Sequence, residues 1–236
     1  MDVASTGVAQ TAPDAEAVAR ARDRLVVALT FATGATDAIG VTRLGNVFAS
    51  VMTGNFVFLG LSVGERSAAV AVHSLVAIFA FMIGAYVGSR IAGHRPANGP
   101  IWPAGVTRAL ALEAAVMAAL AVGWEATAGH PTGILQILML AAAAYCMGSQ
   151  SGAVTGLGVS GLSSTYMTGT FTVLLSTLAV KHQIDRRSAA ILLAIIVGAA
   201  VGGVLVFGAS RWAGPIPFVV LAGVVLAART LHDRYA

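Results

Sequence analysis

An acidic residue, Asp37, lies inside an apolar stretch of the chain, within the run Thr33-Gly34-Ala35-Thr36-Asp37-Ala38-Ile39-Gly40. A carboxylate within a membrane segment costs about 2.5–3.5 kcal/mol on insertion scales, so it normally faces a protein interior or a watery cavity. In such a place it can bind a proton or a cation. We therefore expect Asp37 to point into the protein and to be the first candidate for ion coupling.

Two related motifs supply candidates for solute binding, because Met52-Thr53-Gly54-Asn55-Phe56 recurs as Met167-Thr168-Gly169-Thr170-Phe171 at an offset of 115 residues. Glycine and threonine lower helix propensity. In an unwound stretch, free amides and the positive end of the following helix hold anionic groups, while carbonyls hold cations. The alternative is that the small residues only let helices pack closely. The expected substrate-binding residues are Asp37, Asn46, Thr53, Gly54, Asn55, Gln150, Thr168 and Gly169.

A second ionisable residue, Glu113, lies midway along another apolar segment. It either relays a proton or serves as a structural partner, so Asp37 and Glu113 are the two candidates for coupling. The sequence contains no zinc-protease motif, nucleophile elbow or phosphate-binding loop. We therefore expect no catalytic residues, no metal site and no cofactor.

The composition shows what kind of protein must position these residues. Hydrophobic residues make up 57% of the 236 residues and charged residues 10%, against about 45–50% and about 25% in ordinary soluble chains. A water-exposed surface cannot be built from so few charges, which excludes a cytosolic enzyme and a nucleic-acid-binding domain. The sequence predicts a protein in a lipid bilayer, whose partners are a small polar or charged solute and a proton or cation.

Eight apolar segments can be drawn, and most are long enough for a membrane-spanning helix of about 20 residues. The second and sixth are short and are candidates for re-entrant segments. We expect an all-α transmembrane bundle of six to eight membrane segments, with a disordered polar tail over residues 1–24 and a single transmembrane domain over residues 25–231. The segments are 25–42, 47–63, 68–92, 104–127, 132–157, 162–180, 187–210 and 215–231.

A second repeated pattern supports an internal duplication, since Gly84-Ala85-Tyr86-Val87-Gly88 recurs as Gly198-Ala199-Ala200-Val201-Gly202 at an offset of 114 residues. We expect two homologous halves, residues 25–127 and 132–231. Four crossings per half would make the repeats parallel, and three crossings plus a re-entrant segment would make them inverted. Such repeats are typical of secondary transporters, which bind solute between the halves. The two GxxxG pairs either join the halves or form a homodimer.

The charges give an expected orientation. If all eight segments cross, nine basic residues lie on the side of the N-terminus and five on the other, which favours a cytoplasmic N-terminus. The cluster Arg90, His94 and Arg95 falls on the wrong side in this count. That discrepancy keeps a smaller number of crossings open.

The motifs resemble those of the bacterial YoaK-like family, domain of unknown function 1275, over about residues 25–231. The sequence departs from that family's pattern at Ser149 and at Ser151-Gly152. The resemblance implies an integral inner-membrane protein of bacteria with six or seven crossings. It rests on Gly34-x-x-Asp37-Ala38-Ile39, Phe48 and Met52-Thr53-Gly54-Asn55 in the first half, and on Gly148-Ser149-Gln150 and Thr165-Tyr166-Met167-Thr168-Gly169-Thr170 in the second.

Three functions compete for this sequence. The repeats, the broken segments and Asp37 favour a small-solute secondary transporter or permease with its site between the halves. A non-transport membrane sensor, scaffold or assembly partner is the alternative, and a channel with a continuous polar lining is a further one.

Overall fold

A computed structural model describes residues 12–94, 99–159 and 163–235, and all regular structure in these ranges is helical. The expected all-α class is therefore confirmed. The helices in chain order are α1 (Ala12–Arg43), α2 (Met52–Glu65), α3 (Ala68–Ala92), α4 (Ala104–Ala126), α5 (Gly133–Thr155), α6 (Met167–Lys181), α7 (Arg186–Gly208), α8 (Ser210–Ala213) and α9 (Pro215–Tyr235).

Six helical segments of the described chain are long and apolar enough to cross a membrane: those of α1, α3, α4, α5 and α7, and the α8–α9 segment. The other two helices, α2 with 14 residues and α6 with 15, are about 21 and 22 Å long at 1.5 Å per residue. Both fall short of a hydrocarbon core of about 30 Å. The number of crossings is thus at the lower end of the expected range, and α2 and α6 are the two segments expected to be short.

The start of α1 corrects the expected tail, because residues 12–24 are helical. Two features explain the helix here. Arg20 donates a hydrogen bond to Glu16 one turn earlier, a pairing that supports a helix. Val18 and Val26 are both buried, so the helix already packs on the protein before the apolar segment begins. Residues 1–11 of the expected tail lie outside the described residues.

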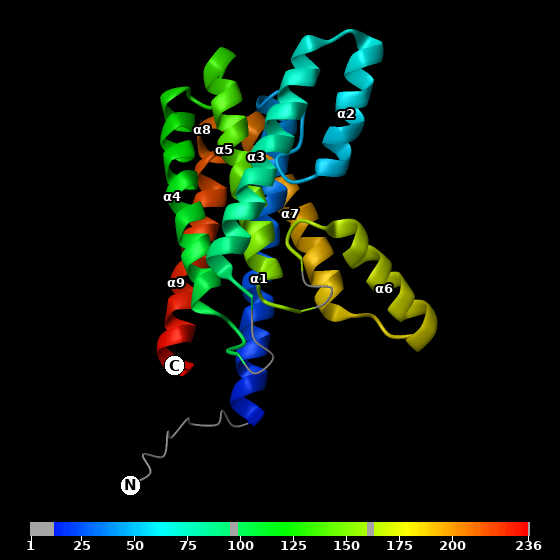
Figure 1. Ribbon diagram of the computed structural model, residues 1–236, viewed down its shortest axis with the longest axis vertical. Helices are drawn as coiled ribbons and strands as arrows, with labels where there is room; N and C mark the ends of the chain where they lie inside the picture. Colours follow the sequence, from blue (N-terminus) through cyan, green and yellow to red (C-terminus); the bar gives the residue numbers. More distant parts are fainter. Residues whose placement is uncertain (1–11, 95–98, 160–162, 236) are drawn as a thin grey trace.

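The long helices pack most extensively in two pairs, α3 with α5 and α1 with α7 (Figure 1). Glycines make both pairs possible. A Cβ added to Gly84 or Gly88 would collide with the α5 backbone at Tyr145 or Ser149. Gly198 and Gly202 lie in the same way against the backbone of α1. Both GxxxG pairs are therefore filled by helices of the same chain.

The helix pairs follow one pattern in both parts of the chain. Contacts of α3 with α5, α2 with α3 and α4 with α5 are matched by contacts of α7 with α1, α6 with α7 and α9 with α1. In Figure 1 the helix α2 lies in the upper part of the molecule and α6 in the lower part, and the start of α1 and the end of α9 also lie in the lower part. Three crossings and one short helix in each half favour inverted repeats. The common origin of the halves remains a prediction.

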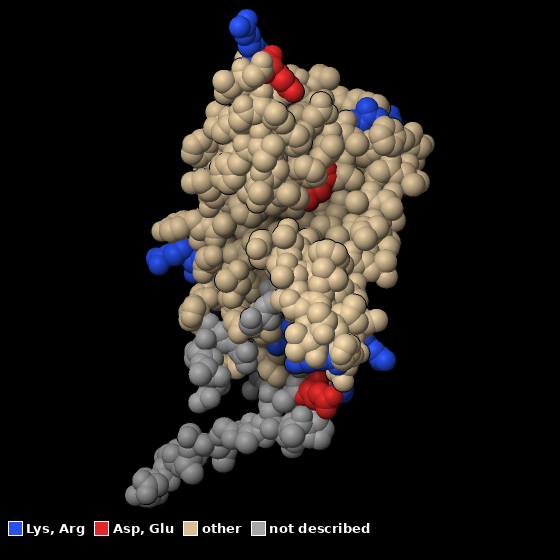
Figure 2. Space-filling view, turned by 90° about the vertical axis from the view of Figure 1, so that its right-hand side faces the viewer, with Lys and Arg blue, Asp and Glu red and all other residues tan. Residues whose placement is uncertain are grey.

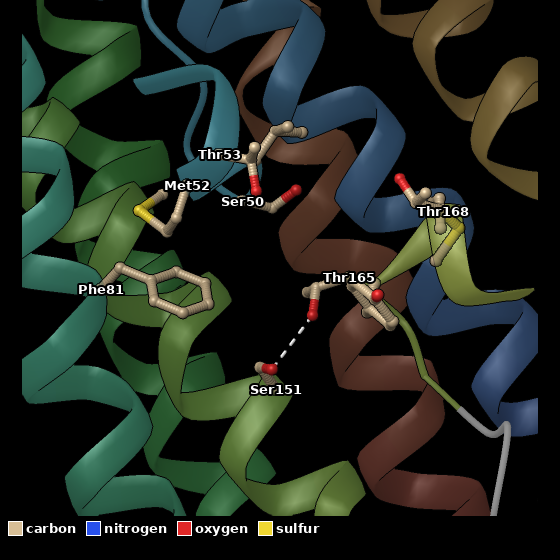
Figure 3. Close-up of a pocket in the computed structure, with 10 residues that line it drawn as sticks. Ser50, Met52, Thr53, Phe81, Ser151, Thr165 and Thr168 are labelled. Carbon is tan, nitrogen blue, oxygen red and sulfur yellow. Dashed lines mark hydrogen bonds between the residues drawn. The ribbon is translucent and has the colours of Figure 1, made fainter. Parts of the chain in front are cut away.

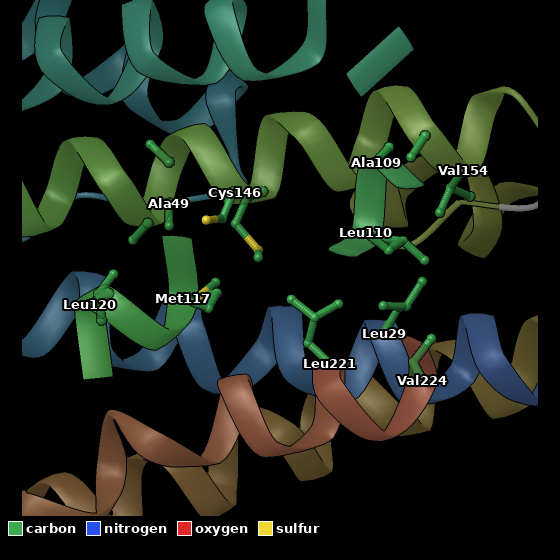
Figure 4. Packing of buried hydrophobic residues seen from close by; sticks show 14 of the residues in the cluster. Leu29, Ala49, Ala109, Leu110, Met117, Leu120, Cys146, Val154, Leu221 and Val224 are labelled. Atoms are coloured by element: carbon green, nitrogen blue, oxygen red, sulfur yellow. The ribbon is translucent and has the colours of Figure 1, made fainter. Parts of the chain in front are cut away.

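The apolar core lies where α1, α4, α5 and α9 meet (Figure 4). Leu29, Leu110, Val154 and Leu221 come from these four helices and are all buried. The short helices contribute little, because α2 buries only Asn55 and Ser62, and α6 only Thr170. The body is thus a packed bundle that carries α2 and α6 on its side.

Candidate functional site

A cavity of about 300 Å³ lies between the N-terminal ends of α2 and α6 (Figure 3). Each short helix ends at charged residues, Glu65-Arg66 and Lys181, and runs about 21 Å inward from there. Because the charged ends lie in the polar interface, each N-terminal end is near the middle of a membrane about 40–45 Å thick with its headgroup regions. The cavity is lined by Ser50, Val51, Met52, Thr53, Phe81, Ser151, Thr165, Tyr166, Met167 and Thr168.

The first turns of α2 and α6 bring hydrogen-bond donors to this cavity. Neither N-cap residue, Val51 nor Tyr166, caps its helix with a side-chain hydrogen bond. The first backbone N–H groups of a helix have no partner within the helix and form its positive end. Together with the lining hydroxyl groups they make a site that suits oxygen atoms of a small polar solute.

Asp37 lies directly behind the cavity wall, inside the protein, with 7% of its surface exposed. Its carboxylate accepts hydrogen bonds from the backbone N–H of Ser50, at 2.8 Å, and from the Ser50 hydroxyl. Ser50 lies near the end of the non-helical loop, residues 44–51, that returns from the end of α1 to α2. Asp37 therefore anchors this loop. Arg43 is not its partner, because the guanidinium of Arg43 donates to the carbonyl oxygen of Val206 at 3.1 Å.

Asn55 is fully buried and holds the same loop. Its amide oxygen accepts from the Phe48 N–H at 3.0 Å, and its amide nitrogen donates to the Phe48 carbonyl at 2.7 Å. Asn46 is exposed in the loop, with a positive φ of 60°. Neither asparagine lines the cavity, in contrast to the expected solute-binding set, because one is occupied by the backbone and the other lies in a turn.

In the second half, Gln150 is fully buried and does not line the cavity. Its amide nitrogen donates to the hydroxyls of Thr33, at 2.9 Å, and Ser164, at 2.8 Å. Gln150 meets α1 at Thr33, one turn before Asp37. It connects α5 to α1 and to the loop before α6.

The glycines of the two motifs have a packing role. A Cβ on Gly54 would lie 3.1 Å from the ring of Phe48, and one on Gly169 would collide with the ring of Tyr166. Thr53 and Thr168 do line the cavity and are exposed. Of the expected binding residues, the structure brings these two threonines together at one site.

Glu113 is fully buried in α4, and its two carboxylate oxygens have no hydrogen-bond partner among the described residues. The Cys146 thiol lies 3.8 Å from its backbone carbonyl oxygen. Glu113 does not line the cavity. Its coupling role stays a prediction.

Several lining residues were not expected from the sequence. Two of them are Ser151 and Thr165, whose hydroxyls form a hydrogen bond of 3.0 Å with Thr165 as the donor (Figure 3). The repeat offset could have identified them, because 114 residues separate Asp37 from Ser151 and 115 separate Ser50 from Thr165. Phe81 has no such signal, since it reaches the cavity only through the packing of α3 on α5.

A second cavity, of about 360 Å³, lies further along α5, at the C-terminal ends of α3 and α5. Ser151 lines the first cavity, and Gly152 and Thr155 line the second. Arg90 and His94 give this second cavity a basic wall.

Comparison with known proteins places these features in a family. The family model described as protein of unknown function (DUF1275) matches residues 25–227. The UPF0700 transmembrane protein YoaK of Bacillus subtilis (strain 168) is 38% identical over 158 residues, which cover 67% of this chain and 68% of that protein. No solved structure matches the chain. With the match extending over nearly all of its helices, the chain belongs to the DUF1275 family of membrane proteins.

Proposed function

We propose that this protein is a small-solute secondary transporter or permease and that the solute binds in the cavity between α2 and α6. The observation that carries the proposal is that one broken membrane segment from each half ends at the same cavity, near membrane mid-depth. Transporters with repeated halves bind their substrates at such places, where half-helix ends and unwound backbone replace water around the solute.

The lining defines the kind of solute. The cavity of about 300 Å³ is at the lower end of the volumes usual for small-molecule sites. Its lining includes the hydroxyl groups of Thr53, Ser151, Thr165 and Thr168 and no lysine or arginine. Such a cavity suits a small molecule with oxygen acceptors and a modest apolar part, the latter against Phe81.

Asp37 gives the site a coupling device. Its carboxylate holds the loop before α2 through two hydrogen bonds from Ser50, a residue that also lines the cavity. Binding of a proton or cation at Asp37 weakens this hold and allows the loop to move. Solute binding and ion binding are thereby linked through one residue. Glu113, buried and without a partner, is the second coupling candidate.

A cytoplasmic N-terminus in the bacterial inner membrane is part of the proposal. With six crossings, the lysines and arginines of the described residues that lie at the bundle end away from the start of α1 and the end of α9 are Arg43, Arg66 and Arg211. The short α2 does not cross the membrane, because its C-terminal end lies on the same side as the end of α1. The helix α3 then crosses back, which places Arg90 on the side where α1 begins. The discrepancy of the eight-crossing count therefore disappears. That side also holds Arg20, Arg22, Arg24, Arg108, Lys181, Arg186, Arg187 and Arg229, as the positive-inside rule requires.

Substitution of the cavity hydroxyls tests the site. A panel of small polar solutes is screened for thermal stabilisation of the purified protein, and the dissociation constant of each hit is measured for Thr53→Val and Thr168→Val. Loss of one hydrogen bond, worth about 0.5–1.5 kcal/mol, weakens binding about two- to tenfold with little change of shape. Thr230→Val on α9, whose hydroxyl bonds its own helix, is the control and leaves binding unchanged. Equal affinity in all four proteins would exclude the cavity as the site.

A further inference from the structure

The cavity lacks a wall on one side. The helix α2 packs on α3, α6 packs on α7, and neither short helix packs extensively on any other described helix. Figure 2 shows this side of the molecule, where the surface is hollowed at mid-height between two projecting parts. Thr53, Tyr166 and Thr168 line the cavity and are exposed at the same time. Their polar groups therefore face outward near the middle of the membrane.

Lipid chains are a poor cover for this opening. The hydrocarbon core has no hydrogen-bonding groups, so non-helical backbone and helix ends at membrane depth are tolerated only against protein or water. The two loops, the uncapped first turns of α2 and α6 and the lining hydroxyls all belong to this category. The site is therefore incomplete in a single chain.

A glycine pair on α2 shows how another chain can approach. Gly60 and Gly64 are spaced four residues apart, both are exposed, and a Cβ on either would meet no atom within 4 Å. The GxxxG pairs on α3, α5 and α7 are each filled by the backbone of a neighbouring helix. The pair on α2 has the same spacing, but no helix of the described chain packs against it, so it is free for close contact with another helix. Its face continues through Phe56, 59% exposed, to Thr53 at the cavity.

We propose that a second copy of this chain packs against the face formed by α2, α3, α6 and α7, with α2 crossing its copy at Gly60 and Gly64. A twofold axis along the membrane normal keeps both copies in one orientation and turns the two hollows toward each other, which closes the cavities. In a twofold interface residue i of one copy contacts residue j of the other and the reverse, and residues near the axis meet their own kind, so a charge near the axis is repelled by its copy. The four helices meet that condition, because between their charged ends they contain no Lys, Arg, Asp or Glu.

Cysteine cross-linking in native membranes tests this contact. The single natural cysteine, Cys146, is fully buried, so Gly60→Cys and Gly64→Cys each add the only accessible thiol. Close crossing of α2 with its copy brings the two thiols within disulfide reach, which requires Cα atoms less than about 7 Å apart. An oxidant such as copper phenanthroline then converts at least half of the Gly60→Cys or Gly64→Cys protein to a covalent dimer. Gly223→Cys on α9, also exposed with an open Cβ position, forms no covalent dimer.

The mass in nanodiscs gives a second readout. The wild type is expected at twice 23.8 kDa, and Gly60→Leu at the mass of one chain, because the added side chain fits the single chain and blocks the crossing. Gly223→Leu remains dimeric. A monomeric wild type, or cross-linking at Gly223 without cross-linking at Gly60 or Gly64, would overturn the proposal. Neither readout involves a solute, so the dimer and the proposed transport function stand or fall separately.

Discussion

Two loops lead to the central cavity, one before α2 and one before α6, and each is tied to the long helix that precedes it. Ser50 bonds to Asp37, 13 residues earlier, and Thr165 bonds to Ser151, 14 residues earlier. The two pairs occupy corresponding positions of the two halves, but their chemical groups differ. A carboxylate accepts two hydrogen bonds in the first half, whereas two hydroxyls share one bond in the second. Only the first of these two contacts contains a group that titrates.

A second difference reinforces the first. Asn55 clamps the backbone of Phe48 with two hydrogen bonds, whereas the corresponding Thr170 bonds only to Tyr166, one turn earlier. The loop before α6 is held instead by Gln150 through Ser164. The two halves thus share one framework and differ in how their loops are fixed. Under the proposed transport function, this difference predicts that ion coupling is confined to the first half.

The largest effect is expected from Asp37→Asn. The amide keeps the size of the carboxylate and one acceptor for Ser50, but it does not titrate. Gradient-driven uptake into reconstituted vesicles is therefore abolished, while expression and solute binding persist. The matched change in the second half, Ser151→Ala, leaves ion-driven uptake in place. Undiminished uptake by Asp37→Asn would break the comparison and make Asp37 a structural residue, and Glu113→Gln would then be the decisive variant for coupling.

A smaller effect, on stability, is expected at the second pair of positions. Asn55→Leu leaves the partly buried N–H and C=O of Phe48 without these partners, and each unsatisfied buried group costs about 1–3 kcal/mol, less where water reaches it. Thr170→Val removes a single hydrogen bond worth about 0.5–1.5 kcal/mol. Unfolding of the two variants in the same detergent measures the difference. If Thr170→Val were the more damaging change, the loop before α6 would be the more firmly held one.

The smallest effect concerns the caps of the equivalent helices α3 and α7. The Ser67 hydroxyl caps α3 and the Asp185 carboxylate caps α7. The hydrogen bond from the Ser188 hydroxyl, above all, holds the pKa of Asp185 below its usual value. Because the folded pKa is depressed, the carboxylate stabilises the fold above the unfolded pKa of about 3.9, and this contribution disappears as pH falls through the folded pKa.

Comparison of the wild type with Asp185→Asn measures this contribution. The charged cap is worth about 0.3–1 kcal/mol, near the lower limit because Asp185 is partly exposed and screened. The difference in unfolding temperature is present at pH 7 and shrinks below pH 4. Ser67→Ala shows no such pH dependence. A difference for Asp185→Asn that grows in acid would contradict the assigned direction of the pKa.

The sequence by itself determined the membrane class, the positions of the helices and the two motif-bearing segments. The apolar segment 68–92 coincides with α3, and 187–210 with α7 to within two residues, because hydropathy and charge act locally. It also identified Asp37, since a carboxylate in an apolar stretch must be buried in protein. The end of the tail was wrong, because packing of Val18 on the protein extends α1 beyond the apolar stretch.

Only the tertiary structure decided which polar groups are partners. Thr53 and Thr168 line the cavity while Asn55 is occupied by Phe48, although the sequence presents all three in one repeated motif. The choice depends on where the loop before α2 turns back and on which face of a helix meets its neighbour. Glycines on α3 and α7 set those faces through contacts between residues more than 50 positions apart. Hydropathy is a property of a segment, whereas the partner of a buried amide or carboxylate is a property of the packed bundle.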